Sequence, residues 1–236
     1  MYFIQSERFL DAYLRCAEHV VNEGRRKSDM NEVQDLACLI SPQLAEWTEF
    51  VAFVERISQD ENLKHGAQKA KRAYERLSGN ITKPSYIGRL KQYPFLKVGT
   101  NDFTPIDQLA LVAEKFGEAP QSSNLSLSVF HPSDLRDAYR PGYVPCLSFI
   151  DVKYRDGELR TKFFFRSCDF AEVALFDFLH CSRIHFSIME NFKEQRPDVD
   201  IRESKILFFF SRAFTYKRKR EPITAIRNAA ALASET

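Results

Sequence analysis

The sequence predicts a mixed α/β (α+β) fold in which helices pack on one side of a mixed or antiparallel sheet. Two observations support this prediction. Apolar residues recur at helical spacing near the amino terminus, as in residues 9–20. Later in the chain, two β-rich runs flank an Asp-Gly pair, which is the strongest short signal for a β-hairpin. The segments do not alternate regularly between strand and helix, so a parallel βαβ sheet fits less well.

The length and composition are those of a globular protein. The chain has 236 residues, enough to bury a substantial core, and its net charge of +2 is too small to indicate a nucleic-acid or membrane partner. No apolar run approaches the roughly 20 residues that span a bilayer, and the start lacks the pattern of a signal peptide. Five cysteines without paired or zinc-ligand spacing favour reduced thiols in a cytoplasmic protein with no metal site.

The first zone, residues 1–78, is expected to be helical. Apolar stripes at helical spacing occupy residues 9–20 and 44–54, and Pro42 precedes the second stripe, where proline suits a helix start. Residues 62–77 predict a more polar, basic helix. Such a run of charge is usually a solvated helix face, so it carries no functional prediction.

The second zone, residues 79–145, opens with loop signals from glycine and proline. A helix is predicted over residues 106–116, ending at Gly117, with Asp107 in its first turn, where a negative charge is favourable. Residues 122–130 then alternate apolar and polar side chains. This period predicts a half-buried strand.

The third zone contains the predicted hairpin. Residues 146–154 and 158–165 are β-rich and are joined by Arg155-Asp156-Gly157. A helical segment is predicted over residues 169–188, and a short apolar strand over residues 205–210. The basic cluster at residues 217–220 follows, before a polar tail.

Several motifs resemble those of the thymidylate synthase and deoxycytidylate (cytidylate) hydroxymethylase family. Pro145-Cys146 and the later Arg166-Ser167-Cys168-Asp169 resemble its Pro-Cys and Arg-Ser-x-Asp motifs. Upstream motifs of the family occur in the same order: Ser85-Tyr86-x-Gly88, Asp107-Gln108-Leu109, Pro120-x-Ser122 and Val129-Phe130-x-Pro132. The resemblance covers about residues 84–180. It implies a single domain over residues 1–236, a catalytic core at about 84–212, a polar tail at about 217–236, and a homodimer formed through the sheet.

The resemblance implies that Cys146 is a nucleophile. Carbon 5 of a pyrimidine becomes nucleophilic after a thiolate adds to carbon 6, and it can then attack a one-carbon donor. A nearby cation favours the thiolate. By resemblance, Arg166 lies near the thiol and binds the nucleotide phosphate, with Ser167 as a second phosphate contact. The remaining cysteines are expected to be small buried hydrophobes: Cys16, Cys38, Cys168 and Cys181.

The resemblance also implies a cofactor, 5,10-methylenetetrahydrofolate. Asp169 is expected to accept N–H donors of its pterin ring, and Tyr86 is expected to contact the same cofactor. Arg26, or its neighbour Arg25, is the candidate for the phosphate-binding arginine that the family carries near its amino terminus. An Arg-Arg pair on a loop is otherwise often only solvated.

Asp177 occupies the position at which thymidylate synthases carry an asparagine that recognises uracil. An ionised aspartate only accepts hydrogen bonds, and a protonated one can also donate one. Cytosine presents an amino donor at carbon 4 and an acceptor at N3, so Asp177 favours cytosine. The alternative is an acidic residue on an exposed helical turn.

Other positions depart from the family. Ser123-Asn124 replaces paired arginines that reach the phosphate across the dimer, which removes two bidentate donors. The apolar run 208–210 replaces the His-x-Tyr that holds the sugar. Leu44 takes the place of the general-base glutamate. Glu46 or Glu49 is the candidate substitute, although their positions on the helical turn direct them elsewhere.

Two classes of function follow. The first is a one-carbon transferase that acts on a pyrimidine nucleotide, with a preference for hydroxymethylation of cytosine. The second is a non-catalytic relative that binds nucleotides or serves as a scaffold. A third reading, nucleic-acid binding through residues 217–220, is weaker because such clusters are usually solvated tails.

Overall fold

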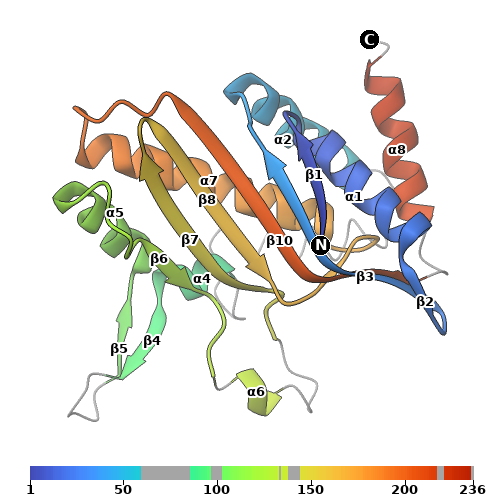
Figure 1. Cartoon of the computed structure of the whole chain (residues 1–236), viewed down its shortest axis with the longest axis horizontal. Coiled ribbons are helices and arrows are strands. Elements are labelled where there is room, and N and C mark those ends of the chain that lie inside the picture. Colours follow the sequence, from blue (N-terminus) through green and yellow to red (C-terminus); the bar gives the residue numbers. More distant parts are fainter. Residues whose placement is uncertain (60–85, 97–102, 133, 138–143, 217–220, 235–236) are drawn as a thin grey trace.

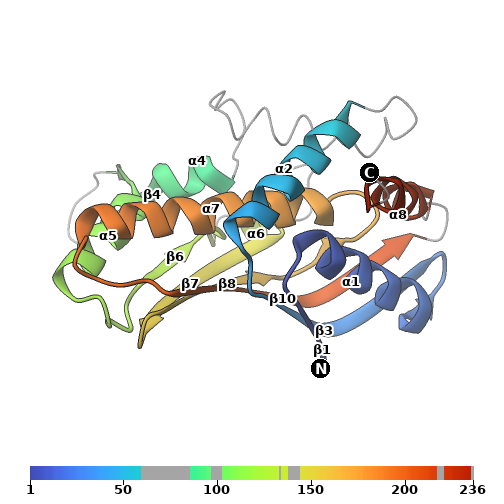
Figure 2. The same cartoon turned by 90° about the horizontal axis from the view of Figure 1, so that it is seen from above.

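A twisted eight-stranded sheet forms one layer of the computed structural model, within the residues described: 1–59, 86–96, 103–132, 134–137, 144–216 and 221–234. The helices lie on one face of this sheet (Figures 1 and 2). The predicted α/β class, with helices on one side of a mixed sheet, is therefore confirmed. None of the helices in the described ranges is long and apolar enough to cross a membrane.

The amino-terminal part alternates strands and helices. Its elements are β1 (Tyr2–Ser6), α1 (Phe9–Glu23), β2 (Arg25–Lys27), β3 (Met30–Ile40) and α2 (Leu44–Ser58). The two predicted helical stripes are thus present as α1 and α2. The expectation of helices throughout residues 1–78 is corrected, because β3 pairs in parallel with β1 and antiparallel with β10. Three consecutive residues of β3, Leu36 to Cys38, are buried, so the strand lacks the alternation of buried and exposed residues that would have predicted it.

The middle of the chain forms short elements beside the sheet. They are α4 (Tyr86–Lys91), β4 (Tyr93–Leu96), β5 (Phe103–Ile106), α5 (Gln108–Glu118), β6 (Ser126–Ser128) and α6 (Asp134–Asp137). Asp107 caps α5, since its carboxylate accepts a hydrogen bond from the Ala110 amide at 3.0 Å. The strand predicted over residues 122–130 is shorter than expected. The predicted basic helix over 62–77 lies outside the described residues.

The carboxy-terminal part begins with the predicted hairpin, β7 (Leu147–Arg155) and β8 (Glu158–Phe165). Its turn residues, Asp156 and Gly157, have φ values of 52° and 85°, as a two-residue hairpin turn requires. The remaining elements are β9 (Cys168–Asp169), α7 (Ala174–Gln195), β10 (Glu203–Tyr216) and α8 (Glu221–Ser234). The expected polar tail is therefore a helix over most of its length. The cluster at residues 217–220 lies outside the described residues.

The sheet has the strand order β1-β3-β10-β8-β7-β6, with β2 beside β3 and β9 beside β10. β10 runs parallel to β8 and antiparallel to β3, so the sheet is mixed. The long β10 therefore joins the amino-terminal strands to the hairpin. It brings residues that are far apart in the sequence into one layer.

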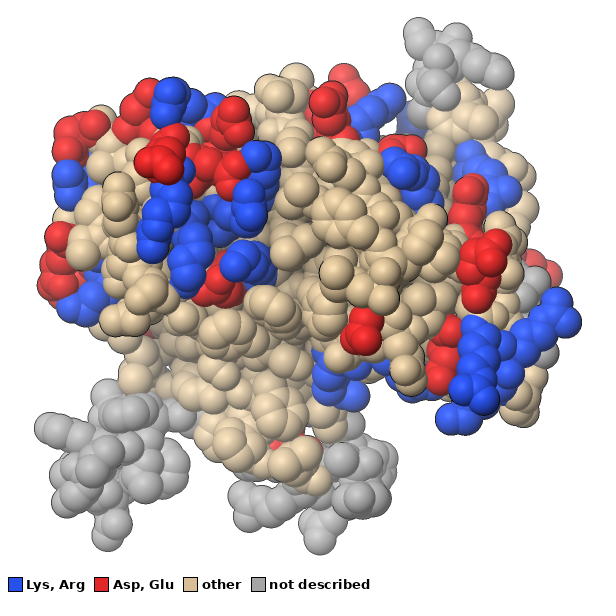
Figure 3. Space-filling model, viewed as in Figure 1, with Lys and Arg blue, Asp and Glu red and all other residues tan. Residues whose placement is uncertain are grey.

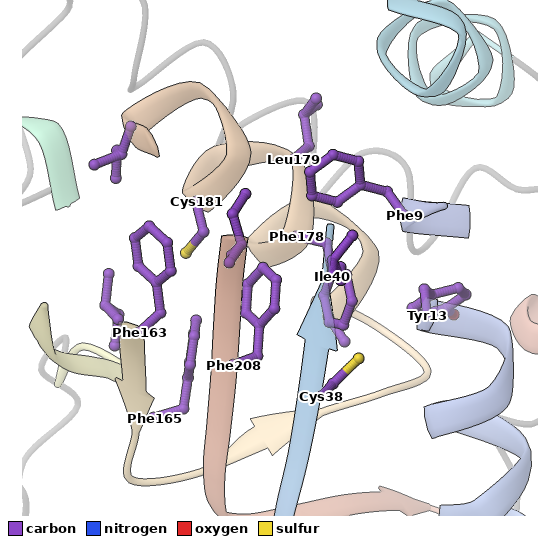
Figure 4. Packing of buried hydrophobic residues seen from close by; sticks show 14 of the residues in the cluster. Phe9, Tyr13, Cys38, Ile40, Phe163, Phe165, Phe178, Leu179, Cys181 and Phe208 are labelled. Atoms are coloured by element: carbon purple, nitrogen blue, oxygen red, sulfur yellow. The ribbon is translucent and has the colours of Figure 1, made fainter. Parts of the chain in front are cut away.

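Helix α7 crosses the inner face of the sheet and forms the centre of the core. Every residue from 174 to 182 is buried, so this part of α7 has no solvent face. Phe178 stacks on Phe208 of β10 with ring centroids 4.2 Å apart, and Phe163 of β8 packs against the same ring (Figure 4). Burying such aromatic side chains contributes a large share of the hydrophobic stabilisation.

The face of the sheet opposite the helices, called the outer face below, carries a row of aromatic residues. The strand register aligns Phe3, Ala37, Phe209, Phe164 and Phe149 across five strands. Neighbouring rings in the last three lie 6.0 Å apart. Figure 3 shows a largely uncharged area in the middle of this face and a cluster of mixed charges at one end.

Candidate active site

Cys146 lies immediately before β7, at the open end of the hairpin, where β7 starts and β8 ends. Its carbonyl accepts a hydrogen bond of 3.0 Å from the amide of Arg166, which follows β8. The hairpin therefore places the nucleophile candidate and the arginine side by side. Both residues lie at one end of the two strands, as the sequence motifs implied.

The Arg166 side chain holds the segment that precedes Cys146. Its Nε donates to the Pro145 carbonyl at 2.9 Å, and its Nη2 donates to the Val144 carbonyl at 3.0 Å. The residue is exposed, and a guanidinium has five N–H donors. Arg166 thus positions the backbone of the nucleophile and retains donors that can face a phosphate.

The Cys146 thiol is half-buried, while the other four cysteines are buried, as expected. Burial raises the pKa of Cys146 to about 11, and the charge of Asp177 adds to this rise. The Arg166 guanidinium and a hydrogen bond from Ser167 act in the opposite direction. Arg166, the predicted cation, therefore lies near the thiol, but desolvation raises the pKa of Cys146 more than Arg166 lowers it.

Asp177 is on α7 and is only 6% exposed, so the alternative of an exposed helical turn is excluded. The Cys168 thiol donates to its Oδ2 at 3.4 Å, and the Tyr86 hydroxyl also donates to it. Burial raises the pKa of Asp177 to about 7, against the effect of these two donors. At neutral pH the carboxyl group is therefore present in both protonation states.

Tyr86 joins α4 to the cluster around Cys146. Its hydroxyl accepts a hydrogen bond from the Leu147 amide at 3.3 Å and donates to Asp177. The resemblance placed Tyr86 at the cofactor, whereas its hydroxyl here contacts the base-recognition candidate. Its role towards a cofactor stays a prediction.

Two polar contacts hold α4 in place, and sequence reasoning missed the partners in both. Arg89 forms a bidentate ion pair with Asp134, with both N–O distances 2.8 Å, and both side chains are largely buried. Gln108 bonds to both backbone groups of Ser128 at 2.8 Å and to the Arg89 carbonyl at 3.2 Å. The Asp-Gln motif signalled Gln108. Nothing in the sequence paired Arg89 with Asp134, which are 45 positions apart.

Asp169 is the last residue of β9, five residues before α7 begins. Its Oδ1 accepts a hydrogen bond of 3.0 Å from the Ala171 amide, and its carbonyl accepts one from the Val173 amide. The carboxylate is close enough to Cys146 to raise the pKa of the thiol slightly. A carboxylate offers about four acceptor positions, so it can accept further N–H donors such as those of a pterin.

Three other candidates lie elsewhere. Arg26 is exposed on β2, opposite Asn31, at the far side of the sheet from β7 (Figure 1). Glu46 accepts a hydrogen bond from the Phe9 amide at 2.8 Å and so caps α1, and Glu49 pairs with Arg8 on the same side. Among the described residues, no hydrogen bond or ion pair joins these side chains to Cys146.

A cysteine beside an arginine, at the end of a hairpin and within electrostatic range of a buried aspartate, is a candidate site for a thiol nucleophile. Residues 31–224 match the family model described as thymidylate synthase. This match covers most of the chain, and the protein therefore belongs to the thymidylate synthase family. Membership indicates one-carbon transfer to a pyrimidine, with methylenetetrahydrofolate as the family's donor. A search of curated proteins gave no match.

Proposed function

We propose that this protein transfers a one-carbon unit from 5,10-methylenetetrahydrofolate to carbon 5 of a cytosine nucleotide, forming a hydroxymethyl product. Water supplies the hydroxyl oxygen, carbon 5 loses its proton, and tetrahydrofolate leaves. The observation that carries the proposal is the position of Asp177, a buried carboxyl group that interacts electrostatically with the Cys146 thiol. When carbon 6 of a pyrimidine lies at Cys146, N3 and the substituent on carbon 4 are on the opposite edge of the ring. In this proposal that edge meets Asp177.

The chemistry of Asp177 supports cytosine. Cys168 and Tyr86 both donate to its carboxylate, which stabilises the ionised form. An ionised oxygen accepts the amino group of cytosine, whereas the carbonyl oxygen at carbon 4 of uracil would meet another acceptor. With a pKa of about 7, Asp177 can also hold a proton that it donates to N3 of cytosine.

The other residues of the cluster take separate roles in this proposal. Cys146 adds to carbon 6 once its proton is lost, and Arg166 orients the thiol through the backbone and contacts the phosphate. Ser167 is a second phosphate contact. Asp169 accepts N–H groups of the pterin, whose cofactor supplies the one-carbon unit. Arg26 remains the candidate for a phosphate contact that comes from β2.

We also propose that two copies associate through the outer face. Its aromatic row and uncharged central area are suited to burial against a second copy, and Phe149 is 38% exposed in one chain. The loop with Ser123 and Asn124 is exposed. Since it lacks the family's paired arginines, a second copy would contribute less positive charge to the phosphate.

The alternative proposal, a non-catalytic nucleotide-binding or scaffold subunit, has its own support. The pKa of Cys146 is near 11, so the thiolate is scarce at neutral pH. Glu46 and Glu49 are engaged with α1. These features describe a site that can hold a pyrimidine without activating it.

One assay separates the two proposals. The protein is incubated with methylenetetrahydrofolate and nucleotides labelled with tritium at carbon 5, namely CMP, dCMP, UMP and dUMP, and tritium release is measured. Release with the cytosine nucleotides, lost in Cys146→Ser, is the expected result. A folded protein that releases no tritium from any of the four would support the non-catalytic alternative.

The same assay tests the role of Asp177. Asp177→Asn is expected to shift preference from cytosine toward uracil by about tenfold or more, because an amide donates toward the oxygen at carbon 4. The matched control is Asp151→Asn, which changes a carboxylate on the outer face of β7. An unchanged base preference in Asp177→Asn would exclude the proposed role.

A further inference from the structure

A cavity of about 240 Å³ lies between α4, α5 and α7, outside the Cys146 cluster. Ile87 of α4, Leu109 of α5 and Ile184 of α7 supply apolar surface to its wall. A wall of this kind suits the body of a small organic molecule rather than an inorganic ion.

His180 also lines this cavity and is only 4% exposed. Among the described residues, its Nε2 has no hydrogen-bond partner. Burial lowers the pKa of the ring to about 3, and the Arg183 charge adds to this effect, so the imidazole is neutral. A buried polar nitrogen without a partner is unfavourable, so a rotation of the ring that turns Nε2 from its buried position toward a ligand atom in the cavity would be favoured.

The charge at the cavity favours an anion with a single charge. Lys91 of α4 and Arg183 of α7 both line it. Arg183 pairs with Glu55 of α2 at 3.3 Å, which offsets one of the two positive charges. About one net positive charge therefore faces the cavity, and Ser187 adds a hydroxyl group.

We propose that this cavity binds a small monocarboxylate with an apolar body. The carboxylate lies toward Lys91 and Arg183, the body packs on the three aliphatic side chains, and the His180 ring turns so that Nε2 bonds to a polar ligand atom. Each part of this ligand matches a part of the wall.

The cavity lies beside the nucleophile site and is separate from it. His180 follows Asp177 by about one turn of α7, and Ser187 lies roughly 15 Å further along the helix axis than Asp177. Helix α4 borders both places, since Tyr86 contacts Asp177 and Ile87 lines the cavity. A molecule in the cavity thus does not occupy the position of the pyrimidine.

The test uses benzoate as the probe on the full chain, without nucleotide or folate. Isothermal titration calorimetry is expected to show one saturable site, and ¹⁵N NMR a shift of one buried histidine ring. Benzamide, which has the same shape without the charge, and inorganic phosphate are expected to bind at least tenfold more weakly. No saturable benzoate binding, or equal binding of phosphate, would overturn the proposal.

Two variants locate the site. Lys91→Met changes an exposed side chain, so it preserves folding, and it is expected to weaken benzoate binding at least fivefold. His180→Leu is expected to do the same and to remove the shifted histidine signal. Lys115→Met, on the exposed side of α5, is the matched control and is expected to leave binding unchanged. Unchanged binding in Lys91→Met would contradict the proposal.

The binding experiment is independent of the proposed transferase activity. Cys146→Ser removes the proposed nucleophile and does not touch the cavity, so this variant is expected to bind benzoate as the unmodified chain does. If the exchange assay fails while benzoate still binds, only the proposed chemistry is excluded.

Discussion

At the scale of single residues, Cys146 holds its proton at neutral pH. Its pKa of about 11 leaves only about one molecule in ten thousand as thiolate at pH 7. Burial is the main cause, and the Asp177 charge is the second. The positive charge of Arg166 alone therefore does not ionise the Cys146 thiol. The proposed reaction depends on a change in the burial of this thiol or in the charge of Asp177.

The rate of Cys146 alkylation tests this state directly. The rate with iodoacetamide is expected to rise about tenfold per pH unit between pH 8 and pH 10, because the thiolate is the reactive form. Mass spectrometry identifies the labelled residue, and Cys146→Ser is the control that leaves only buried cysteines. A plateau that begins near pH 8.5 would show an unperturbed thiol.

Asp177→Asn changes the same measurement in a defined direction. Above pH 7 the Asp177 carboxylate is negative, and this charge opposes ionisation of the nearby thiol. Replacing it with a neutral amide is expected to lower the pKa of Cys146, so alkylation at pH 9 becomes faster. Slower alkylation in this variant would mean that Asp177 does not act on the thiol through its charge.

Sequence reasoning identified most of the cluster and missed its electrostatics. The Pro-Cys and Arg-Ser-x-Asp motifs led to Cys146 and Arg166, which the hairpin does bring together. The sequence could not show that burial raises the pKa of Cys146 more than Arg166 lowers it, because burial depends on which residues the fold packs around the thiol. The contact between Tyr86 and Asp177 was missed for the same reason, since 91 positions separate the two.

At the scale of elements, the turn between β7 and β8 rests on Gly157. Its φ of +85° is a conformation that residues with a side chain rarely adopt, and an added Cβ would lie 2.4 Å from Arg202 Nε. Gly157→Ala is expected to lower the free energy of unfolding by about 1–3 kcal/mol, measured by urea denaturation.

Gly117→Ala is the matched control for this turn. Gly117 lies in α5, and an added Cβ would meet Gln195 at 3.4 Å, an ordinary contact. Alanine has a higher helix propensity than glycine, so this substitution is expected to leave the free energy of unfolding unchanged or to raise it by up to about 1 kcal/mol. Equal destabilisation by the two substitutions would mean that backbone conformation is not what Gly157 provides.

The elements that sequence reasoning predicted share a strong local signal. Helices α1 and α2 have apolar stripes at helical spacing, and the hairpin has an Asp-Gly turn. Strand β3 has no such signal, because residues 36–38 are all buried and its partner β10 lies far along the chain. Helix α8 was hidden by its alanine-rich, polar composition, which indicates a tail as readily as a helix.

At the scale of the whole molecule, the outer face tests the proposed dimer. Phe149→Asp places a charge within the aromatic row and is expected to convert a dimer into a monomer in analytical ultracentrifugation, because a buried unpaired charge is costly. Leu44→Asp is the control, since Leu44 is exposed on α2 in the helical layer. A protein that is monomeric before any substitution would exclude association through this face.

The buried part of α7, residues 174–182, has a consequence for the proposed recognition of the base. A helix without a solvent face has little freedom to open locally, so its amide protons are exposed to exchange mainly when the whole core opens. Asp177 is carried on this buried part of α7, while Tyr86 approaches it from the short helix α4. In the proposed function, selection of the base would thus depend on a preorganised carboxyl group rather than on a loop that adapts to its ligand. Recognition of this kind favours a narrow range of substrates.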